Sequence, residues 1–266
     1  MKTRVILVLT AVAVLIACTR VPISGRKQVN LLPESQMMAM SYQQYQVFLD
    51  SNAVVGAADR NAKMVADVGA KIAAAVEQYL KDNGQSKRVE GFEWEFRLVD
   101  DPTVNAWCMP GGKVVFYTGI LPVCADETGL AVVMGHEVAH AIARHGNERM
   151  SEQLIVQAGG MTLAVLMSEK PQLAQDLFLT SYGIGSQLGS LAFSRQHETE
   201  ADKLGLVFMA MAGYDPQQAP IFWERMSAGG GAAPPEFLST HPSHETRIAN
   251  LKDFMPEALK YYKKPS

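Results

Sequence analysis

The sequence has little cysteine, no surplus of basic residues and no second long hydrophobic run after its N-terminus, and each shortage excludes a class of protein. Lysine and arginine total 24 against 27 aspartates and glutamates, a formal net charge of -3. A strong nucleic-acid binder would carry a basic surplus, so no nucleic-acid partner is expected. Hydrophobic residues make up 48% of the 266 positions, which excludes a disordered chain. The length suits one domain of ordinary or slightly large size, or two small ones.

The N-terminus has the pattern of an export signal. Lys2 and Arg4 precede an uncharged, largely apolar run over 5–17. This run is shorter than the roughly 20 residues that span a bilayer, and it suits a signal peptide. It ends in Leu15-Ile16-Ala17-Cys18, which resembles the bacterial lipobox, where cleavage precedes a cysteine that then receives a lipid.

We therefore predict a lipoprotein signal peptide over 1–17, a lipid anchor on Cys18, a short polar tether over 18–29 and one folded domain over 30–266. The lipid on Cys18 makes the membrane a predicted partner. Thr19 follows the anchor position, and bacterial lipoproteins without aspartate there usually go to the outer membrane. We expect a cell-envelope protein on the periplasmic side of the outer membrane. The alternative is an ordinary signal peptide or short anchor in which Cys18 is incidental.

The odd cysteine count divides into one anchor and one pair. With Cys18 lipidated, Cys108 and Cys124 remain. In an oxidising compartment two such thiols favour a disulfide, so we predict a Cys108–Cys124 bridge. Two reduced, buried thiols are the alternative, because sequence does not give the Cα separation that a bridge requires.

Hydrophobic periodicity predicts a mainly helical fold with one small sheet. Apolar residues recur at helical spacing in two segments before residue 81 and again after Gly119. Between them, 92–98 alternates apolar and polar residues like a half-buried strand, and short strands over 105–109 and 113–118 flank a Pro-Gly-Gly turn. We predict an α+β, mainly α domain with a small antiparallel sheet immediately before a long helix over 122–146.

The predicted helix 122–146 carries the motif His136-Glu137-Val138-Ala139-His140. Its two histidines are one turn apart on the same face, so both imidazoles can reach one Zn²⁺ ion. Glu137 projects beside them as a candidate general base. A chance occurrence on a core helix is the alternative. A periodic helix that follows a hairpin in an exported chain favours zinc, one ion per subunit.

The same helix does not supply a third ligand. In the pattern HExxHxxGxxH a glycine and a third histidine follow, but Ala143 and Gly146 stand at those positions. His145 lies on the opposite side of a continuous helix from His136. We interpret His145 as a structural or helix-end histidine.

A later acidic segment supplies candidates for the third ligand. Glu198 and Asp202 are four residues apart and share one helix face, as a metal ligand and an acid that orients a histidine would. Glu200 points away from Glu198, so it is expected to meet solvent or Arg195. An ordinary solvated acidic face is the alternative.

Five motifs occur in an order that resembles a known family: His136 to His140 (HEVAH), Glu198 to Asp202 (ETEAD), the hairpin from Asn105-Ala106 to Pro110-Gly111-Gly112, Ala212-Gly213-Tyr214-Asp215-Pro216, and Thr240-His241-Pro242-Ser243 with Arg247. Over about residues 30–255 the chain resembles the gluzincin metallopeptidases that include HtpX and the CAAX prenyl endopeptidases. Those two are multi-span membrane enzymes. Because this chain lacks their spans, it is more similar to the periplasmic lipoprotein branch, and the resemblance implies a zincin-like metallopeptidase domain.

The resemblance also implies roles for individual residues. It makes Glu137 the general base and gives three zinc ligands, His136, His140 and Glu198. Asp202 is then the acid behind a ligand. His241 matches a histidine that stabilises the tetrahedral intermediate, and Arg247 matches an arginine that lines the same cleft.

The hairpin offers an edge strand to a substrate. An extended chain could pair with the backbone of Asn105, Ala106, Trp107 and Cys108, and such pairing reads backbone more than side chain. This predicts unfolded or misfolded envelope proteins as substrates of a zinc endopeptidase that acts in quality control. The alternative is a chaperone-like lipoprotein or assembly factor, working with the envelope assembly machinery, in which proteolysis is secondary or latent.

Overall fold

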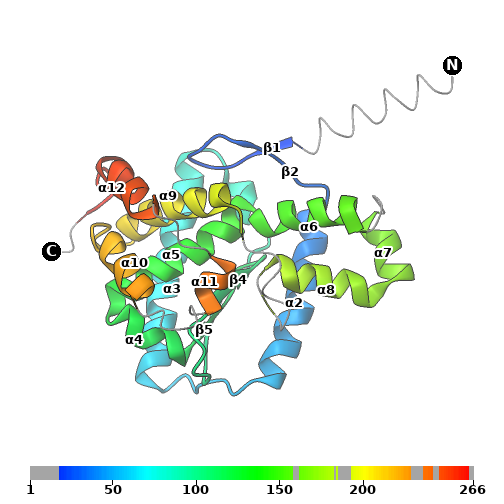
Figure 1. Ribbon diagram of the computed structural model, residues 1–266, viewed down its shortest axis with the longest axis horizontal. Helices are drawn as coiled ribbons and strands as arrows, with labels where there is room; N and C mark the ends of the chain where they lie inside the picture. Colours follow the sequence, from blue (N-terminus) through cyan, green and yellow to red (C-terminus); the bar gives the residue numbers. More distant parts are fainter. Residues whose placement is uncertain are drawn as a thin grey trace.

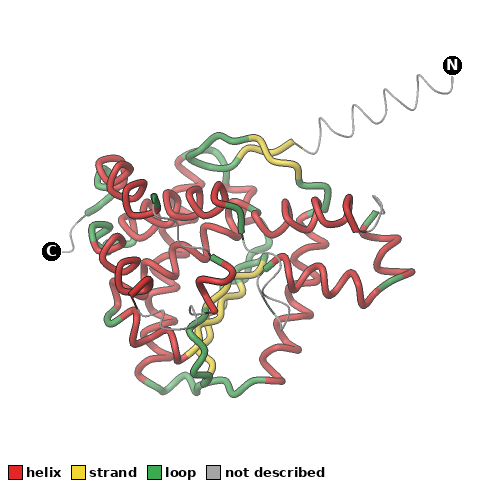
Figure 2. The backbone as a smooth tube through the Cα atoms, viewed as in Figure 1, coloured by secondary structure: helices red, strands yellow, loops and turns green. Residues whose placement is uncertain are grey.

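The computed structural model describes residues 18–157, 162–182, 184, 193–228, 236–241 and 246–263. The predicted signal peptide over 1–17 lies outside these residues. Helices dominate and surround a small sheet (Figures 1 and 2). The elements in chain order are β1 (Cys18–Arg20), β2 (Lys27–Val29), α2 (Glu34–Ser51), α3 (Arg60–Asp82), η1 (Ser86–Val89), β3 (Glu95–Val99), β4 (Ala106–Met109), β5 (Lys113–Tyr117), η2 (Thr118–Ile120), α4 (Leu121–Cys124), α5 (Glu127–Ala143), α6 (His145–Gln157), α7 (Leu163–Glu169), α8 (Pro171–Ser181), α9 (Arg195–Met211), α10 (Gln218–Ala228), α11 (Glu236–Thr240) and α12 (Arg247–Ala258).

The sheet is mixed, with strand order β3-β5-β4. β4 and β5 form the predicted antiparallel hairpin, but β3 lies parallel to β5 on its other side. The prediction of an antiparallel sheet was therefore wrong for β3. After β3 the chain forms β4 at the far edge of the sheet, and β5 then fills the position between β3 and β4. The hydrophobic pattern of single strands does not reveal this order. Among the described strands, β4 has one neighbour and forms an edge.

The sheet lies between two groups of helices. Alternate residues of β5 enter two different cores: Val114 and Phe116 pack with α3, α5 and α9, whereas Val115 and Tyr117 pack with α2, α6 and α8. A strand buried on both faces reads as a continuous apolar run, as β5 does. The hairpin turn requires glycine, because Gly111 and Gly112 have φ of 80° and 81°.

Helix α5 is the central helix, and every residue from Gly129 to Ala143 is buried. Its first turn is capped by Asp126, whose carboxylate accepts from the Gly129 N–H. The helix crosses α9 at a contact between Gly135 and Gly205, where a Cβ on Gly135 would lie 2.9 Å from the Gly205 oxygen. The absence of side chains at this crossing lets the backbones of the two helices approach closely.

We expect Gly135→Val to destabilise the protein by about 1–3 kcal/mol, because the added atoms meet backbone that cannot rotate away. Urea unfolding measures the loss. Ala70→Val, on the exposed face of α3, is the control and should change the free energy of unfolding by no more than about 0.5 kcal/mol. Equal effects of the two substitutions would contradict close packing at this crossing.

The helix predicted over 122–146 is interrupted at both ends. Ala125 has φ of 67° between α4 and α5, and Arg144 has φ of 61°, in the left-handed region, between α5 and α6. The turn at Arg144 changes the direction of the chain, so His145 does not continue the face that a straight helix would give it. Neither residue is a glycine or proline, and the pattern therefore predicted a single helix.

The predicted Cys108–Cys124 disulfide is wrong, because both thiols are free and buried. Cys108 pairs with Val114 near the hairpin turn, whereas Cys124 follows the opposite end of β5. Burial raises the pKa of the Cys124 thiol to about 12, and burial likewise raises the pKa of Cys108. Both side chains therefore behave as small core residues in the protonated form.

The segment predicted as a tether is structured. Residues 18–29 contain the antiparallel pair β1 and β2, and Val21 is 1% exposed. Figure 1 shows this hairpin above α6 and α9. Within the described ranges, we find no helix with the length and apolar character needed to cross a membrane.

Candidate metal centre

Four donor side chains converge between α5, α9 and the end of α11. They are His136 and His140 from α5, Glu198 from α9 and His241, which directly follows α11, and their donor atoms all lie within 4.8 Å of one another. The Nε2 atoms of His136 and His140 are 3.1 Å apart, and Nδ1 of His241 is 3.0 Å from Oε1 of Glu198. All four residues are buried. The helical spacing of the first two histidines therefore produces the convergence that the sequence predicts.

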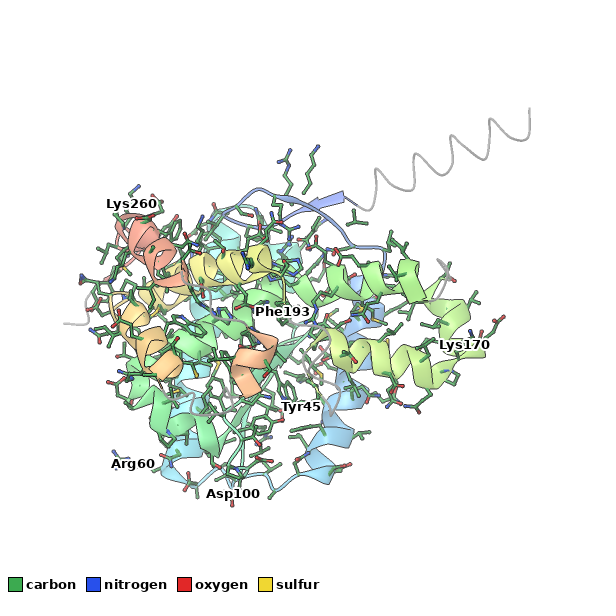
Figure 3. All side chains as sticks on the ribbon, viewed as in Figure 1. Tyr45, Arg60, Asp100, Lys170, Phe193 and Lys260 are labelled. Carbon is green, nitrogen blue, oxygen red and sulfur yellow. The ribbon has the colours of Figure 1, made fainter. Side chains whose placement is uncertain are left out.

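Phe193 closes one side of the four-donor cluster. Its ring lies 4.0 Å from the His140 ring and 5.1 Å from the His241 ring, measured between centroids. Figure 3 labels Phe193 near the middle of the molecule, and the residue lies shortly before the start of α9. This aromatic wall excludes water from the donors, which strengthens electrostatic interactions among them.

Asp202 and Arg247 support the donors from behind. The Asp202 carboxylate lies 3.0 Å from Nδ1 of His136 and accepts a hydrogen bond from it, so Nε2 of that histidine faces the cluster. Arg247 donates to Asp202 at 2.6 Å and lies 3.1 Å from Oε2 of Glu198. Its guanidinium also stacks 3.3 Å from the Trp223 ring. Arg247 is thus buried behind the donors and does not line an open cleft.

The donors fit a zinc ion on two observations. Oε1 of Glu137 is buried without a hydrogen bond from any described residue, and a buried carboxylate oxygen requires a cation or a donor. Burial lowers the pKa of His136, but the charge of Glu198 and the hydrogen bond to Asp202 outweigh it and raise the pKa to about 9. Burial lowers the pKa of the other imidazole donor, His140, well below its ordinary value. The second observation is therefore the donor set itself, because two imidazoles with a carboxylate suit Zn²⁺.

Glu137 has the environment of a group that exchanges protons. It is 2% exposed, and burial raises its pKa. Its Oε1 lies 3.5 Å from Nε2 of His241. Because this carboxylate accepts no hydrogen bond at Oε1, it is available to a molecule that enters the site.

His241 lies among the metal donors and not beside them. The sequence predicts a residue that stabilises an intermediate, but the structure brings its Nδ1 within 3.3 Å of Nε2 of His136. Four protein donors describe a closed zinc site, whereas a catalytic site keeps one position open. If zinc were held by His136, His140 and Glu198, His241 would lie near enough to offer a fourth protein donor.

The four predicted substrate-binding residues lie in or beside the edge strand β4. Asn105, Ala106, Trp107 and Cys108 are each 4% exposed or less. The Phe237 N–H of α11 donates to the Val104 carbonyl, so α11 lies against the start of this strand. These fractions refer to whole residues, so both the backbone and the side chains of this strand are buried in the arrangement described here. The substrate role of these residues stays a prediction.

A second cluster of polar residues adjoins the donors, and the sequence did not predict it. Glu200, expected to face solvent, is 5% exposed and accepts from Arg26 and Ser24. His145 is fully buried, 3.2 Å from Glu200 and 3.0 Å from His140. The expectation for Glu200 was wrong because the hairpin at 18–29, read as a tether, covers that face of α9. The turn at Arg144 brings His145 back toward His140. The position of His145 at the start of α6 was the feature of the sequence that could have indicated this contact.

Glu148 in this second cluster makes stability depend on acid pH. Burial alone would raise its pKa, but hydrogen bonds from Arg26 and His197 outweigh burial and lower the pKa to about 2. Since the pKa is below the ordinary 4.5, the stabilisation is present above about pH 4.5 and is lost as pH falls toward 2.

We expect Glu148→Gln to remove part of this acid dependence, so that its stability falls less steeply than that of the wild type between pH 4.5 and 2. Urea unfolding of metal-free protein measures the slope without a contribution from zinc release. Glu169→Gln, at the exposed end of α7, serves as the control and should keep the wild-type slope. An unchanged slope in Glu148→Gln would contradict the assignment.

The fold and the donor set define a class of protein. A helix with HExxH supplies two histidines and a base, and a second helix supplies a glutamate ligand and a further acid, as in zinc metallopeptidases. The family model described as "Peptidase family M48" matches residues 66–255 of this chain. The chain belongs to that family.

Several curated proteins are similar to this chain. The mitochondrial metalloendopeptidase OMA1 of Schizosaccharomyces pombe is 42% identical over 168 residues, which cover 62% of this chain and 48% of that protein. Human OMA1 is 30% identical over 248 residues, 90% of this chain and 46% of that protein. The β-barrel assembly-enhancing protease of Escherichia coli is 32% identical over 166 residues, 60% and 34% respectively. The chain thus spans about half or less of the length of these relatives.

Proposed function

We propose that this chain is a zinc-dependent endopeptidase of the bacterial cell envelope that cleaves unfolded or misfolded envelope proteins. The observation that carries the proposal is the buried carboxylate of Glu137, which accepts no hydrogen bond at Oε1 from the described residues, beside a His-His-Glu donor set. Membership of family M48 and the metalloendopeptidase names of the relatives support the same chemistry.

The chain's own residues account for the proton transfers. His136, His140 and Glu198 would hold zinc, which supplies a Lewis acid that polarises a carbonyl and lowers the pKa of water. Glu137 accepts the proton of the attacking water and delivers it to the leaving amine. Its raised pKa suits this, because the carboxylate gains the proton more readily than an exposed glutamate does. Asp202 and Arg247 hold the ligands in orientation throughout.

The edge strand supports a preference for unfolded substrates. β4 has one strand neighbour in the described sheet. Its residues are buried in this arrangement, so an extended peptide would first displace the covering segments and then add to the edge through backbone hydrogen bonds. A folded protein does not present a free extended segment. We therefore expect selection by conformation more than by sequence.

The experiment compares one protein in two states. Purified enzyme with zinc is incubated with a denatured outer-membrane β-barrel and with the same barrel folded in detergent, and fragments are counted by mass spectrometry. We expect rapid cleavage of the denatured form alone and no cleavage after chelation. Equal cleavage of both forms would contradict selection by conformation, and cleavage that persists without metal would contradict zinc catalysis.

Localisation follows from the proposed lipid anchor of the periplasmic lipoprotein branch. Cys18→Ser should move the protein from the outer-membrane fraction to the soluble periplasm with its zinc content unchanged, because it removes the acceptor of the lipid. Membrane fractionation measures the shift, and Cys108→Ser is a control that should leave the fraction unchanged. A Cys18→Ser protein still in the outer membrane would contradict the anchor.

One observation favours a second function. His241 lies within 4.8 Å of the other three donors, and as a fourth ligand it would leave a bound zinc ion without an open position. A chaperone-like or assembly-factor role, in which the chain holds clients along β4 while His241 blocks catalysis, is the alternative. This second function requires that the Glu137→Gln variant still corrects an envelope defect that the wild type corrects.

A further inference from the structure

The second polar cluster lies between the metal donors and the N-terminal hairpin. Its five members are Arg26, His145, Glu148, His197 and Glu200, and the two histidines and two glutamates are each no more than 7% exposed. They come from the β1–β2 hairpin, α6 and α9. The proposed reaction uses none of them, although one contacts a metal donor.

That contact is between His145 and His140. Nε2 of His140 faces the other donors, 3.3 Å from Oε1 of Glu198, while its Nδ1 lies 3.0 Å from Nδ1 of His145. A histidine that binds metal through Nε2 carries its proton on Nδ1. His140 is therefore the donor in this pair, and Nδ1 of His145 is the acceptor.

The hydrogen bonding continues from His145 to Glu200. Because Nδ1 of His145 accepts, its proton is on Nε2, and that atom lies 3.2 Å from Oε2 of Glu200. The Glu200 carboxylate accepts a hydrogen bond from this N–H group. A single direction of hydrogen bonds thus runs from the metal ligand through His145 to Glu200, and each group determines the tautomer of the previous one.

Arg26 holds the end of this chain of hydrogen bonds. Its Nε donates to both oxygens of Glu200 at 2.9 Å, and its two terminal nitrogens donate to the two oxygens of Glu148 at 2.6 and 2.7 Å. Glu148 in turn accepts from His197, whose ring stacks on His145 at 4.4 Å. Arg26 therefore positions His145 through the hydrogen bond and through the stacked ring.

We propose that Arg26 is a positioning residue for the zinc ligand His140, and that the docked hairpin at 18–29 thereby helps set the affinity of the metal site. His136 is oriented by Asp202 of α9. His140 is instead oriented by the hydrogen bonds through His145 and Glu200, which end at Arg26 of the N-terminal hairpin. The inference depends on the zinc site and not on the substrate or location proposed above.

The test measures zinc release from the full-length protein without an activity assay. Zinc-loaded wild type and variants are mixed with excess chromophoric chelator, and zinc affinity is obtained by competition. Loss of a partner behind a ligand typically costs 10- to 100-fold in metal affinity. We expect about 10-fold weaker binding in Arg26→Met, a smaller loss in Arg26→Lys, which keeps the charge, and up to about 100-fold in His145→Phe.

Arg20→Met is the matched control. Arg20 is an exposed arginine of the same hairpin that donates to the Gly25 carbonyl and contacts neither acid. Its zinc affinity should equal that of the wild type. Circular dichroism establishes that each variant is folded, and Glu200→Gln, which keeps an acceptor for His145, is the milder variant if Arg26→Met does not fold.

The double variant separates positioning from general structural support. If Arg26 acts through His145, Arg26→Met with His145→Phe binds zinc no more weakly than His145→Phe alone. The absorption spectrum of bound Co²⁺ should likewise change in both single variants and not in Arg20→Met. Wild-type zinc affinity in folded Arg26→Met, or losses that multiply in the double variant, would overturn the proposal.

Discussion

Glu137→Gln is expected to retain zinc and to cleave an unfolded protein about 10²–10⁴-fold more slowly than the wild type, the range that general acid–base catalysis contributes. The amide has nearly the same shape as the carboxylate but cannot accept the proton of the attacking water. The three residues assigned as ligands are unchanged, so metal content should be unchanged. Casein cleavage and bound-metal analysis measure the two quantities on the same sample.

The control for this substitution is Glu127→Gln. Glu127 lies in the first turn of the same helix, and its side chain is 58% exposed. Its neutral variant should keep wild-type activity. Casein cleavage by Glu137→Gln at the wild-type rate would contradict its role as base, and loss of zinc would show that it holds the metal.

The same variant decides between the two functions proposed. If Glu137→Gln protein fails to correct an envelope defect that the wild type corrects, proteolysis is the function. Full correction by the inactive variant would favour the chaperone-like role.

The metal site was predictable where it depends on helical spacing alone. His136 and His140 are four residues apart, as are Glu198 and Asp202, and a regular helix brings each pair to one face. The helices α5 and α9 carry these pairs, and the close crossing at Gly135 and Gly205 is the tertiary fact that joins them. Sequence spacing within one helix predicts neighbours, but the pairing of two helices depends on packing.

What the sequence did not predict depends on contacts between distant segments. Glu200 faces away from Glu198, as expected, but a face of a helix is exposed only if no other segment covers it. The hairpin with Arg26 covers it, 174 residues earlier in the chain. The order of strands and the separation of Cys108 from Cys124 have the same origin, because each depends on where the chain crosses the sheet.

Arg247 was assigned by resemblance alone, and its surroundings give it a larger role than lining a cleft. It is 1% exposed, contacts both Glu198 and Asp202, and stacks on Trp223. Two buried carboxylates thus share one buried cation. The removal of one partner from such an ion pair leaves an uncompensated buried charge, which costs about 3–5 kcal/mol.

We therefore expect Arg247→Met to lower the free energy of unfolding of the zinc-free protein by about 3–5 kcal/mol, measured by urea unfolding with a chelator present. With zinc bound the loss should be smaller, because the cation compensates Glu198. Arg225→Met is the control, since Arg225 is exposed and, among the described residues, donates to the carbonyls of Val123 and Cys124, and we expect a loss below about 1.5 kcal/mol. If the two variants lose the same stability, or if zinc does not reduce the loss in Arg247→Met, then Arg247 does not balance the charge of the ligand carboxylate.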